Sequence, residues 1–301
     1  MFKKVIFICL LTIGVHYFSL SQPIEALRQR INKVVEGKSA TVGVAIWGTD
    51  PGDSLSILGS RHLPMQSVYK YHLALAVLHQ VDQGKLSLDQ VVSIDKSLME
   101  TYQHLWSPLR EANPDGVDIS LAEVIRYTVA WSDNVGCDLL FDLVGGTNAV
   151  ESYLHSIGIR DIAVVHKEIV MQADWESQYD NWTTVTAANQ ALKLFFENKE
   201  GLWSQESHQF LLEVLKGTKT GTKRIRGLLP EETIVAHKTG YSGKNEEGLS
   251  GAVNNIGVVF LPTGTHFYIS VFVSDSVERD ETNQRMIAEI ARLAWDHFNE
   301  R

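Results

Sequence analysis

The hydrophobic positions near both ends of the chain fall in short alternating or β-rich runs, which predict β-strands. The stretch "TVGVAIWG" (41–48) places Val, Val and Ile at every second position, and a second short strand is expected at 55–58. Three further β-rich runs near the C-terminus, "ETIVAHKTG", "NNIGVVFLP" and "HFYISVFVSD", are separated by Gly, Pro and Asn turns. We therefore expect strands from both ends of the chain.

Helical periodicity dominates between these two strand regions. From residue 66 to about 216 the signals are mostly helical, most clearly in "LAEVIRYTVA" and "TAANQALKLFFEN". Helical spacing also marks 23–35 and the last helix, 282–298, whose apolar positions fall on one face. A stripe of this kind is more often core packing than a binding surface.

Strands at both ends that bracket a helical middle favour an α+β fold (an α/β sandwich). In the simplest arrangement, about 22–62 and 219–301 form one antiparallel sheet flanked by helices, and about 63–218 form an all-helical lobe inserted into it. A cleft between two lobes is a common place for an active site. We expect 22–301 to be a single catalytic domain.

The first 21 residues predict a secretory signal peptide. Lys3 and Lys4 form a basic start, 5–15 is a short apolar run, and small residues precede a cleavage site after Ser21. The alternative is a membrane anchor, but a run of about eleven apolar residues is short of the roughly twenty that span a bilayer. We expect no membrane span in the rest of the chain, and export across the inner membrane into the periplasm.

Charge and cysteine content narrow the classes of partner. Removing the two signal lysines from 27 basic residues leaves 25, against 36 acidic residues, so the mature net charge is near −11. An acidic surface argues against nucleic acid as a partner, because phosphate binding needs a basic face. Cys9 leaves with the signal peptide, so Cys137 is alone, and its helical, apolar context favours a buried, inert thiol over a reactive one.

The histidines predict neither a metal site nor another cofactor. They are scattered, and none forms an H-x-H or H-E-x-x-H pattern. We therefore expect packing or surface positions for His72, His79 and His237.

Three short motifs occur along the chain, each of them weak alone. They are Ser67-Val68-Tyr69-Lys70, Ser132-Asp133-Asn134 and Lys238-Thr239-Gly240. Ser67 follows Pro64 where a helix is predicted to begin, and the free N–H groups and dipole of a helix start favour developing negative charge. Lys70 lies one turn further on the same face, within reach of the Ser67 oxygen.

Two other stretches repeat these patterns in the wrong context. Ser93 and Lys96 have the serine–lysine spacing but no comparable helix start. Residues 219–221 repeat Lys-Thr-Gly in the polar stretch "KGTKTGTKR", whereas Lys238 ends the apolar run "TIVAH" and so belongs on a strand or at its end.

In this order and context the three motifs resemble the signature of serine β-lactamases and penicillin-binding proteins, and they imply that fold. The stretch "VVHKEIVMQADWESQYDNWTT" (164–184) looks like the omega loop of class A β-lactamases, closest to their extended-spectrum, PER/VEB-like branch. "GGTNAVESYLHSIGIRD" and "GTKRIRGLLP" extend the resemblance over nearly the whole mature chain. The resemblance implies hydrolysis of the β-lactam amide of penicillins and cephalosporins through a serine acyl-enzyme, and hence antibiotic resistance.

Within the omega loop the resemblance puts Glu168 at the position of the family's water-activating glutamate. Glu176, in "DWESQ", is a competing candidate, but the "AD…QY.NW" segment of that branch follows its glutamate by several residues. Most class A enzymes have an asparagine four residues after the glutamate, where it helps to hold the water. Here that residue is Gln172, which leaves the geometry of the loop and its water contacts open.

The resemblance also implies the chemical role of each motif residue. Ser67 would attack the lactam carbonyl and form the acyl-enzyme. Lys70 would accept or relay its proton, although whether Lys70 or Glu168 through water is the acylation base is disputed for this class. Ser132 would pass a proton to the leaving lactam nitrogen, and Asn134 would hydrogen-bond the side-chain amide of the substrate.

The substrate-binding side would use the last strand motif and an arginine. The backbone N–H groups of the nucleophile and Tyr241 would form an oxyanion hole, and Tyr241 is bulkier than the Thr, Ser or Ala of many relatives. Lys238, Thr239 and Arg224 would bind the substrate carboxylate, since a guanidinium suits this planar group. Arg226 is the nearest competitor of Arg224.

Three other functions share part of this pattern. A D-alanyl-D-alanine peptidase has the same first steps, but Glu168 and the compact length argue against it. A non-hydrolysing β-lactam sensor normally carries a membrane span joined to a signalling domain. A serine glutaminase shares the fold but does not explain the omega loop. We expect small-molecule β-lactams as the partners of a monomer.

Overall fold

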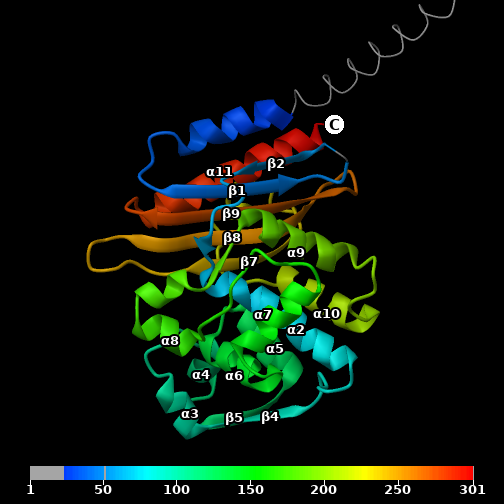
Figure 1. The fold of residues 1–301 in the computed structure, drawn as a ribbon, viewed down its shortest axis with the longest axis vertical. Helices are drawn as coiled ribbons and strands as arrows, with labels where there is room; N and C mark the ends of the chain where they lie inside the picture. Colours follow the sequence, from blue (N-terminus) through cyan, green and yellow to red (C-terminus); the bar gives the residue numbers. More distant parts are fainter. Residues whose placement is uncertain (1–23, 51, 301) are drawn as a thin grey trace, which may run out of the picture.

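A five-stranded antiparallel sheet with helices on both faces forms the upper half of the protein in Figure 1. The computed structural model describes residues 24–50 and 52–300, so the expected signal peptide lies outside the described residues. The sheet has the order β2-β1-β9-β8-β7. Its strands are β1 (Thr41–Trp47), β2 (Ser54–Ile57), β7 (Val235–Tyr241), β8 (Ser250–Phe260) and β9 (His266–Ser276). Strands from the two ends of the chain therefore meet in one sheet, as the sequence pattern predicts.

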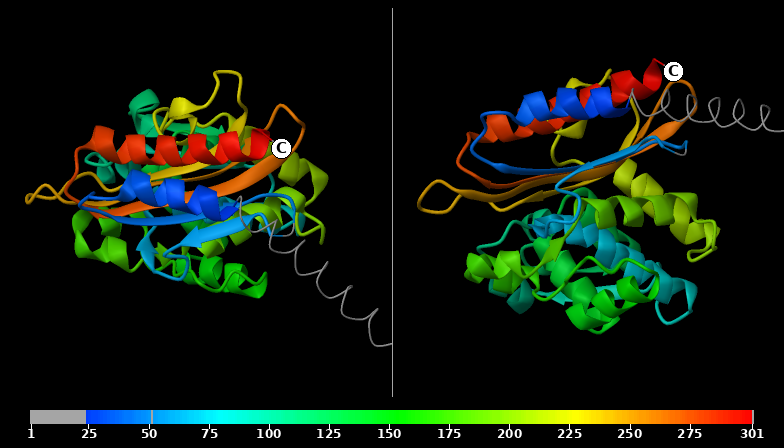
Figure 2. Two further views of the ribbon diagram at one scale, coloured as in Figure 1. Left: turned by 90° about the horizontal axis from the view of Figure 1, so that it is seen from above. Right: turned by 45° about the horizontal axis from the view of Figure 1, so that its top comes forward.

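One face of this sheet is covered by the helix at 24–35 and by α11 (Asp280–Asn299), as Figure 2 shows. The alternation along β1 explains the two layers. Val42, Val44 and Ile46 belong to the core shared with these two helices, whereas Ala45 belongs to the core on the opposite face. Successive strand residues point to opposite faces, so a period of two supplies both cores.

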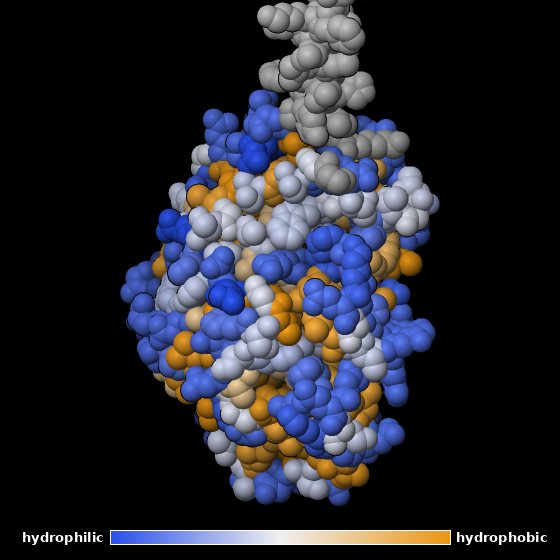
Figure 3. Space-filling view, turned by 45° about the vertical axis from the view of Figure 1, so that its right-hand side comes forward, coloured by the Kyte–Doolittle hydropathy of each residue, from blue (hydrophilic) through white to orange (hydrophobic). Residues whose placement is uncertain are grey.

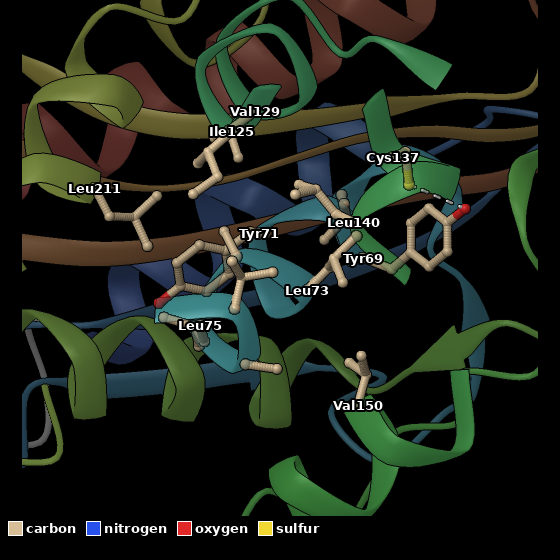
Figure 4. Packing of buried hydrophobic residues seen from close by; sticks show 14 of the residues in the cluster. Tyr69, Tyr71, Leu73, Leu75, Ile125, Val129, Cys137, Leu140, Val150 and Leu211 are labelled. Atoms are coloured by element: carbon tan, nitrogen blue, oxygen red, sulfur yellow. Dashed lines mark hydrogen bonds between the residues drawn. The ribbon is translucent and has the colours of Figure 1, made fainter. Parts of the chain in front are cut away.

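The helices between the strand regions lie on the other face of the sheet (Figures 1 and 2). They are α2 (Tyr69–Asp82), α3 (Lys96–Thr101), α4 (Pro108–Ala112), α5 (Leu121–Ala130), α6 (Asn134–Val144), α7 (Thr147–Ser156), α8 (Glu168–Ala173), α9 (Val185–Glu197) and α10 (Gln205–Lys216), with the 3₁₀ helices η1 (Gln66–Val68) and η2 (Glu176–Tyr179). The third 3₁₀ helix, η3 (Ile225–Leu228), instead packs against α11 on the first face. The first ten residues of α2 are all buried. A helix buried on every side lies at the centre of its core, and Figure 4 shows side chains of α2 packed among those of α5, α6 and α7.

Two short ladders interrupt the helical region, and the sequence pattern missed them. β4 (Val91–Asp95) pairs with β5 (Gly116–Ser120), and β3 (Leu63–Pro64) pairs with β6 (Trp182–Thr183). In β4 only the second and fourth residues are buried. This alternation was visible in "VVSID", but polar neighbours on both sides obscured it.

Cys137 is buried in α6, as its apolar context predicts. Its thiol donates a hydrogen bond to the Tyr69 hydroxyl, with a sulfur–oxygen distance of 3.6 Å (Figure 4). Burial raises the pKa of the Cys137 thiol well above its usual value. Since the thiolate is the reactive form, this side chain acts as a small core residue.

Two of the three singled-out histidines are core residues. His72 and His237 are buried, and burial lowers the pKa of His72 to about 4 and that of His237 to about 3. His79 is partly exposed near the end of α2. Among the described residues, no group of three or more His, Cys, Asp or Glu side chains could hold a metal ion.

The face drawn in Figure 3 is mainly hydrophilic, with hydrophobic residues interspersed among the polar ones. The large hydrophobic side chains that are exposed come from many separate elements, among them Val91 in β4 and Val277 before α11. No helix in 24–50 or 52–300 is long and apolar enough to cross a membrane.

Candidate active site

Ser67, Lys70 and Glu168 meet around one carboxylate oxygen. Ser67 lies in η1, immediately before α2, and its Oγ is 3.4 Å from Glu168 Oε1. The Lys70 ammonium lies 3.0 Å from the same oxygen, and both charged side chains are essentially buried. A buried ion pair of this kind is costly to break, since removing one partner leaves an uncompensated charge. The Ser67–Lys70 spacing therefore brings both groups to one point, together with a glutamate about 100 residues away.

The Lys70 ammonium also contacts the Ser-Asp-Asn segment. It donates hydrogen bonds to the Ser132 carbonyl oxygen at 2.9 Å and to Asn134 Oδ1 at 2.5 Å. Ser132 has a φ of 61°, in the left-handed region that non-glycine residues seldom occupy. Such strain persists only where the surroundings enforce it, and it is common at functional sites.

Asp133, the middle residue of that motif, keeps this segment in place. One of its carboxylate oxygens caps α6 by accepting from Gly136 N at 2.8 Å. The other accepts from Ser107 Oγ at 2.7 Å and Leu109 N at 2.8 Å. This supporting role was absent from the sequence interpretation, because Ser107 and Leu109 become neighbours only in the fold.

Lys238 on β7 approaches the site from the sheet. Its ammonium donates to Ser132 Oγ at 2.9 Å and is completely buried. Burial, together with the nearby Lys70 charge, lowers the pKa of Lys238 well below its usual value. The strand passes so close to the nucleophile turn that a Cβ on Gly240 would lie 2.4 Å from the Met65 carbonyl oxygen. A glycine is therefore required where the strand passes the turn.

A cavity of about 390 Å³ opens beside these groups. Most of the residues proposed from the sequence line it, together with Trp106, Thr220, Ser242 and Gly243, which the sequence interpretation missed. The full lining is Ser67, Trp106, Ser132, Asn134, Gln172, Thr220, Arg224, Thr239, Tyr241, Ser242 and Gly243. Nothing in the local pattern around Trp106 marked it, because the hydrogen bonds that join its loop to the site go to Trp131 O and Asn134 N, which are distant in sequence.

Arg224 supplies the positive charge of the cavity wall. Its guanidinium donates to the carbonyl oxygens of Gly240 at 2.8 Å and Asn254 at 2.7 Å, and only 7% of the residue is exposed. The competing Arg226 instead reaches the carbonyl of Lys216 at 3.4 Å and does not line the cavity. The geometry therefore favours Arg224 over Arg226 as a ligand for an anionic group.

The position of Glu168 in the omega loop is fixed by hydrogen bonds from its backbone to the side chain of Asp138. Asp138 on α6 accepts from the N–H groups of Glu168 at 2.8 Å and Ile169 at 3.0 Å, at the first turn of α8. Glu168 is 1% exposed, whereas the competing Glu176 is exposed on η2. Gln172 is exposed at the rim of the cavity, at the other end of α8. Of the two candidate glutamates, Glu168 is therefore the one that lies buried beside Ser67.

The comparisons with known proteins assign the chain to a family. Residues 26–298 match the model of the Beta-lactamase enzyme family, so the chain belongs to that family and is a class A β-lactamase, a hydrolase of β-lactams. It is 44% identical to the extended-spectrum beta-lactamase PER-1 of Pseudomonas aeruginosa over 95% of this chain and 92% of the relative. It is 41% identical to beta-lactamase VEB-1 of the same organism over 90% of each chain.

A solved structure extends the agreement to the fold. The crystal structure of a beta-lactamase from Chitinophaga pinensis superposes with a TM-score of 0.87 at 46% sequence identity, over 91% of this chain and all of that one. The fold class and the extended-spectrum resemblance inferred from the sequence are thus confirmed.

Proposed function

We propose that the chain hydrolyses the β-lactam amide of penicillins and cephalosporins through an ester on Ser67. The observation that carries this assignment is the convergence of Ser67 Oγ and Lys70 Nζ on Glu168 Oε1, at 3.4 and 3.0 Å. A nucleophile beside a buried base, with a cation that orients both, is the arrangement that activates a weak hydroxyl.

In acylation, Ser67 Oγ bonds to the lactam carbonyl carbon and loses its proton either to Lys70, which must then be a neutral amine, or to Glu168 through a water. The carbon–nitrogen bond then breaks, and the ring nitrogen takes a proton from Ser132, whose Oγ lies 2.9 Å from Lys238 Nζ. The proton that Ser67 released is passed on to Ser132, so that no net proton is lost. The backbone N–H groups of Ser67 and Tyr241 stabilise the negative oxygen, a contribution worth about 10²–10³ in rate for one donor.

The substrate is held at both ends of its ring system. Thr239, Lys238 and Arg224 bind its carboxylate, and Asn134 hydrogen-bonds its side-chain amide. A buried arginine that is already fixed by two carbonyls loses little side-chain freedom on binding, which favours affinity.

In deacylation, Glu168 removes a proton from a water that attacks the ester carbonyl. The carbon–oxygen bond to Ser67 then breaks and the serine recovers its proton. Gln172 at the rim of the cavity contributes to the placement of this water. An acyl-enzyme that turns over in this way separates a β-lactamase from a penicillin-binding or sensor protein, in which the ester persists.

The test compares turnover of a chromogenic cephalosporin by the wild type, Glu168→Gln and Glu176→Gln. We expect sustained wild-type turnover and a Glu168→Gln variant that stops after about one equivalent, with kcat lowered about 10²–10⁴-fold through loss of the general base. Glu176→Gln is the matched control, because its carboxylate is exposed. A wild type that itself stops after one equivalent would instead support a penicillin-binding or sensor protein.

We further propose that the protein is exported to the periplasm with cleavage after Ser21, and that 22–301 acts there as one monomeric catalytic domain that confers β-lactam resistance. The basic start and short apolar run at the N-terminus support export. Mass spectrometry of the protein from the periplasmic fraction tests the cleavage site, and light scattering tests the oligomeric state.

A further inference from the structure

A tyrosine–aspartate hydrogen bond forms one wall of the cavity. Tyr241 is the last residue of β7, and its hydroxyl donates to Asp280 Oδ2 at 2.7 Å. Asp280 is the first residue of α11, which covers the face of the sheet that lies away from the helical region. Tyr241 lines the cavity and is 44% exposed, so its ring faces the space that a substrate would enter. The hydrogen bond therefore ties a cavity wall to the start of a long helix.

Arg224 constrains the same ring from a second direction. Its guanidinium carbon lies 5.7 Å from the centre of the Tyr241 ring, within the range of a cation–π contact. The guanidinium cannot move freely, since it donates to the carbonyl oxygens of Gly240 and Asn254. The ring is thus held at its hydroxyl by Asp280 and along its body by a fixed cation.

The pKa values of Tyr241 and Arg224 keep the phenol a hydrogen-bond donor and the guanidinium a cation at neutral pH. Burial, followed by the Asp280 carboxylate, raises the pKa of Tyr241 to about 12. Burial lowers the pKa of Arg224 to about 10, and Tyr241 and Asp280 oppose that change. At neutral pH the phenol is therefore a donor and Arg224 a cation, so the wall has one arrangement.

The position of this wall matters because of the chemistry of the substrate. In a cephalosporin the C3 substituent is carried by the carbon next to the one that bears the carboxylate. A carboxylate bound at Thr239 and Arg224 therefore leaves that substituent near Tyr241, since Tyr241 lines the same cavity and its ring centre lies 5.7 Å from the Arg224 guanidinium carbon. This step rests on the proposed function.

We propose that Tyr241 is a specificity-determining residue and that Asp280 positions it, so that a fixed phenol ring disfavours cephalosporins with a bulky C3 group. Asp280 contacts the Tyr241 side chain through this hydrogen bond and does not line the cavity. A ring without this bond can turn aside, and the same bulky group then fits. The discrimination appears in KM, because only the Tyr241 ring is involved, whereas the backbone N–H of Tyr241 that faces the reacting carbonyl is unchanged.

The test measures kcat and KM for two cephalosporins that differ only at C3, one with a methyl group and one with a bulky group that is not eliminated on hydrolysis. Tyr241→Thr removes the wall, and we expect the preference for the methyl compound to fall about tenfold, since steric fit in a pocket is typically worth 10-fold or more. Tyr241→Phe and Asp280→Ala should each lower that preference about threefold, mainly through KM. The double variant should lower it no further, because two residues that act through one bond are not additive.

Two variants separate the hydrogen bond from a general structural effect. Asp280→Asn keeps an acceptor oxygen and should retain the wild-type preference. Tyr179→Phe is the matched control, since the Tyr179 hydroxyl donates to Asp275 at 2.8 Å but does not line the cavity. We expect it to leave the preference unchanged.

The outcomes distinguish this inference from the proposed function. A wild type that turns over both compounds, with a preference that survives Tyr241→Thr, Tyr241→Phe and Asp280→Ala, would overturn the inference and leave the function standing. Additive effects of Tyr241→Phe and Asp280→Ala would overturn the positioning role of Asp280. If Tyr241→Thr does not fold, Tyr241→Phe against Asp280→Asn still decides the question.

Discussion

Strand β7 and the omega loop both deliver a charged group to the same cavity, but they are held in place differently. β7 pairs along its full length with β8, with Lys238 opposite Ile256, so its position depends on backbone hydrogen bonds that most side chains allow. Glu168 lies on a helix of only six residues, whose first N–H groups bond to the Asp138 carboxylate. The strand side of the site should therefore tolerate polar substitutions that the loop side does not.

Asn181 holds the omega loop in place through hydrogen bonds of its side chain and its backbone. Its side-chain oxygen accepts from Val165 N at 2.7 Å and His166 N at 2.9 Å, and its side-chain nitrogen donates to the His166 carbonyl at 2.8 Å. Its own carbonyl accepts from Met65 N at 2.9 Å, two residues before the nucleophile. Asn181 thus connects the segment before Glu168 to the segment before Ser67.

The largest effect is expected for Asn181→Ala. The change leaves two N–H groups and a carbonyl without their partners, so the free energy of unfolding should fall by about 2–4 kcal/mol. The loop would also relax around Glu168, and a displacement near 1 Å can cost about 10² in rate. Denaturant unfolding measures the first effect, and single-turnover kinetics should show slower deacylation with acylation little changed.

Asn198→Ala is the matched control for this variant. The Asn198 side chain also ties a loop, since it donates to the Trp203 carbonyl at 2.8 Å and accepts from Trp203 N at 3.3 Å. It lies between α9 and α10, away from the cavity lining. An Asn181→Ala variant that deacylates as fast as Asn198→Ala would contradict the account of the loop.

A second prediction uses the charge of Asp138. Burial, followed by the Glu168 charge, raises the pKa of Asp138 from 3.8 to about 6. The folded state then binds more protons than the unfolded state between these values, so this group stabilises the fold below pH 4, and that contribution is lost as the pH rises through 6. A difference of this size corresponds to a free energy on the order of 2–3 kcal/mol.

Asp138→Asn removes this titration, so it tests whether the stability of the loop side depends on the charge of a single side chain. Between pH 4 and pH 7 the free energy of unfolding of the wild type should fall relative to the variant, by the amount given above. Denaturant unfolding at several pH values measures it. If the free energy of unfolding varied with pH in the same way for the two proteins, Asp138 would have an ordinary pKa and this prediction would be wrong.

The two regions also differ in how much the sequence predicts. Alternation located β1, and β-rich runs between turn residues located β7, β8 and β9, because strands that are buried on both faces of a sheet carry a strong apolar signal. The β3–β6 ladder has two residues per strand, one of them Pro64, and no periodicity can reveal it. Its existence depends on the loop that carries Trp182.

For the site, the motif residues were predictable and their supports were not. Ser67, Lys70 and Lys238 follow from spacing and from the helix or strand that carries them. Asp138 reads as an ordinary polar residue in the helical stretch "NVGCDLLFDLV", because its partners lie 30 and 31 residues further along the chain. Asn181 bonds to backbone groups, which leave no trace in a pattern of side chains.

The smallest effect is expected on the strand side, for Ser250→Ala in β8. The Ser250 hydroxyl is buried, and it has no hydrogen-bond partner among the described residues. Replacing an unpaired buried hydroxyl with a methyl group removes a desolvation cost, so the free energy of unfolding should stay the same or rise by up to about 1 kcal/mol. Denaturant unfolding of this variant, measured alongside Asn181→Ala, gives the direct comparison.

A loss of more than about 1 kcal/mol in the free energy of unfolding would mean that the Ser250 hydroxyl stabilises the strand through a hydrogen bond. The sheet side of the site would then also depend on side chains. An unchanged value would support the contrast, because a buried polar residue lost from the ladder would then cost nothing while one lost from the loop would impair the reaction.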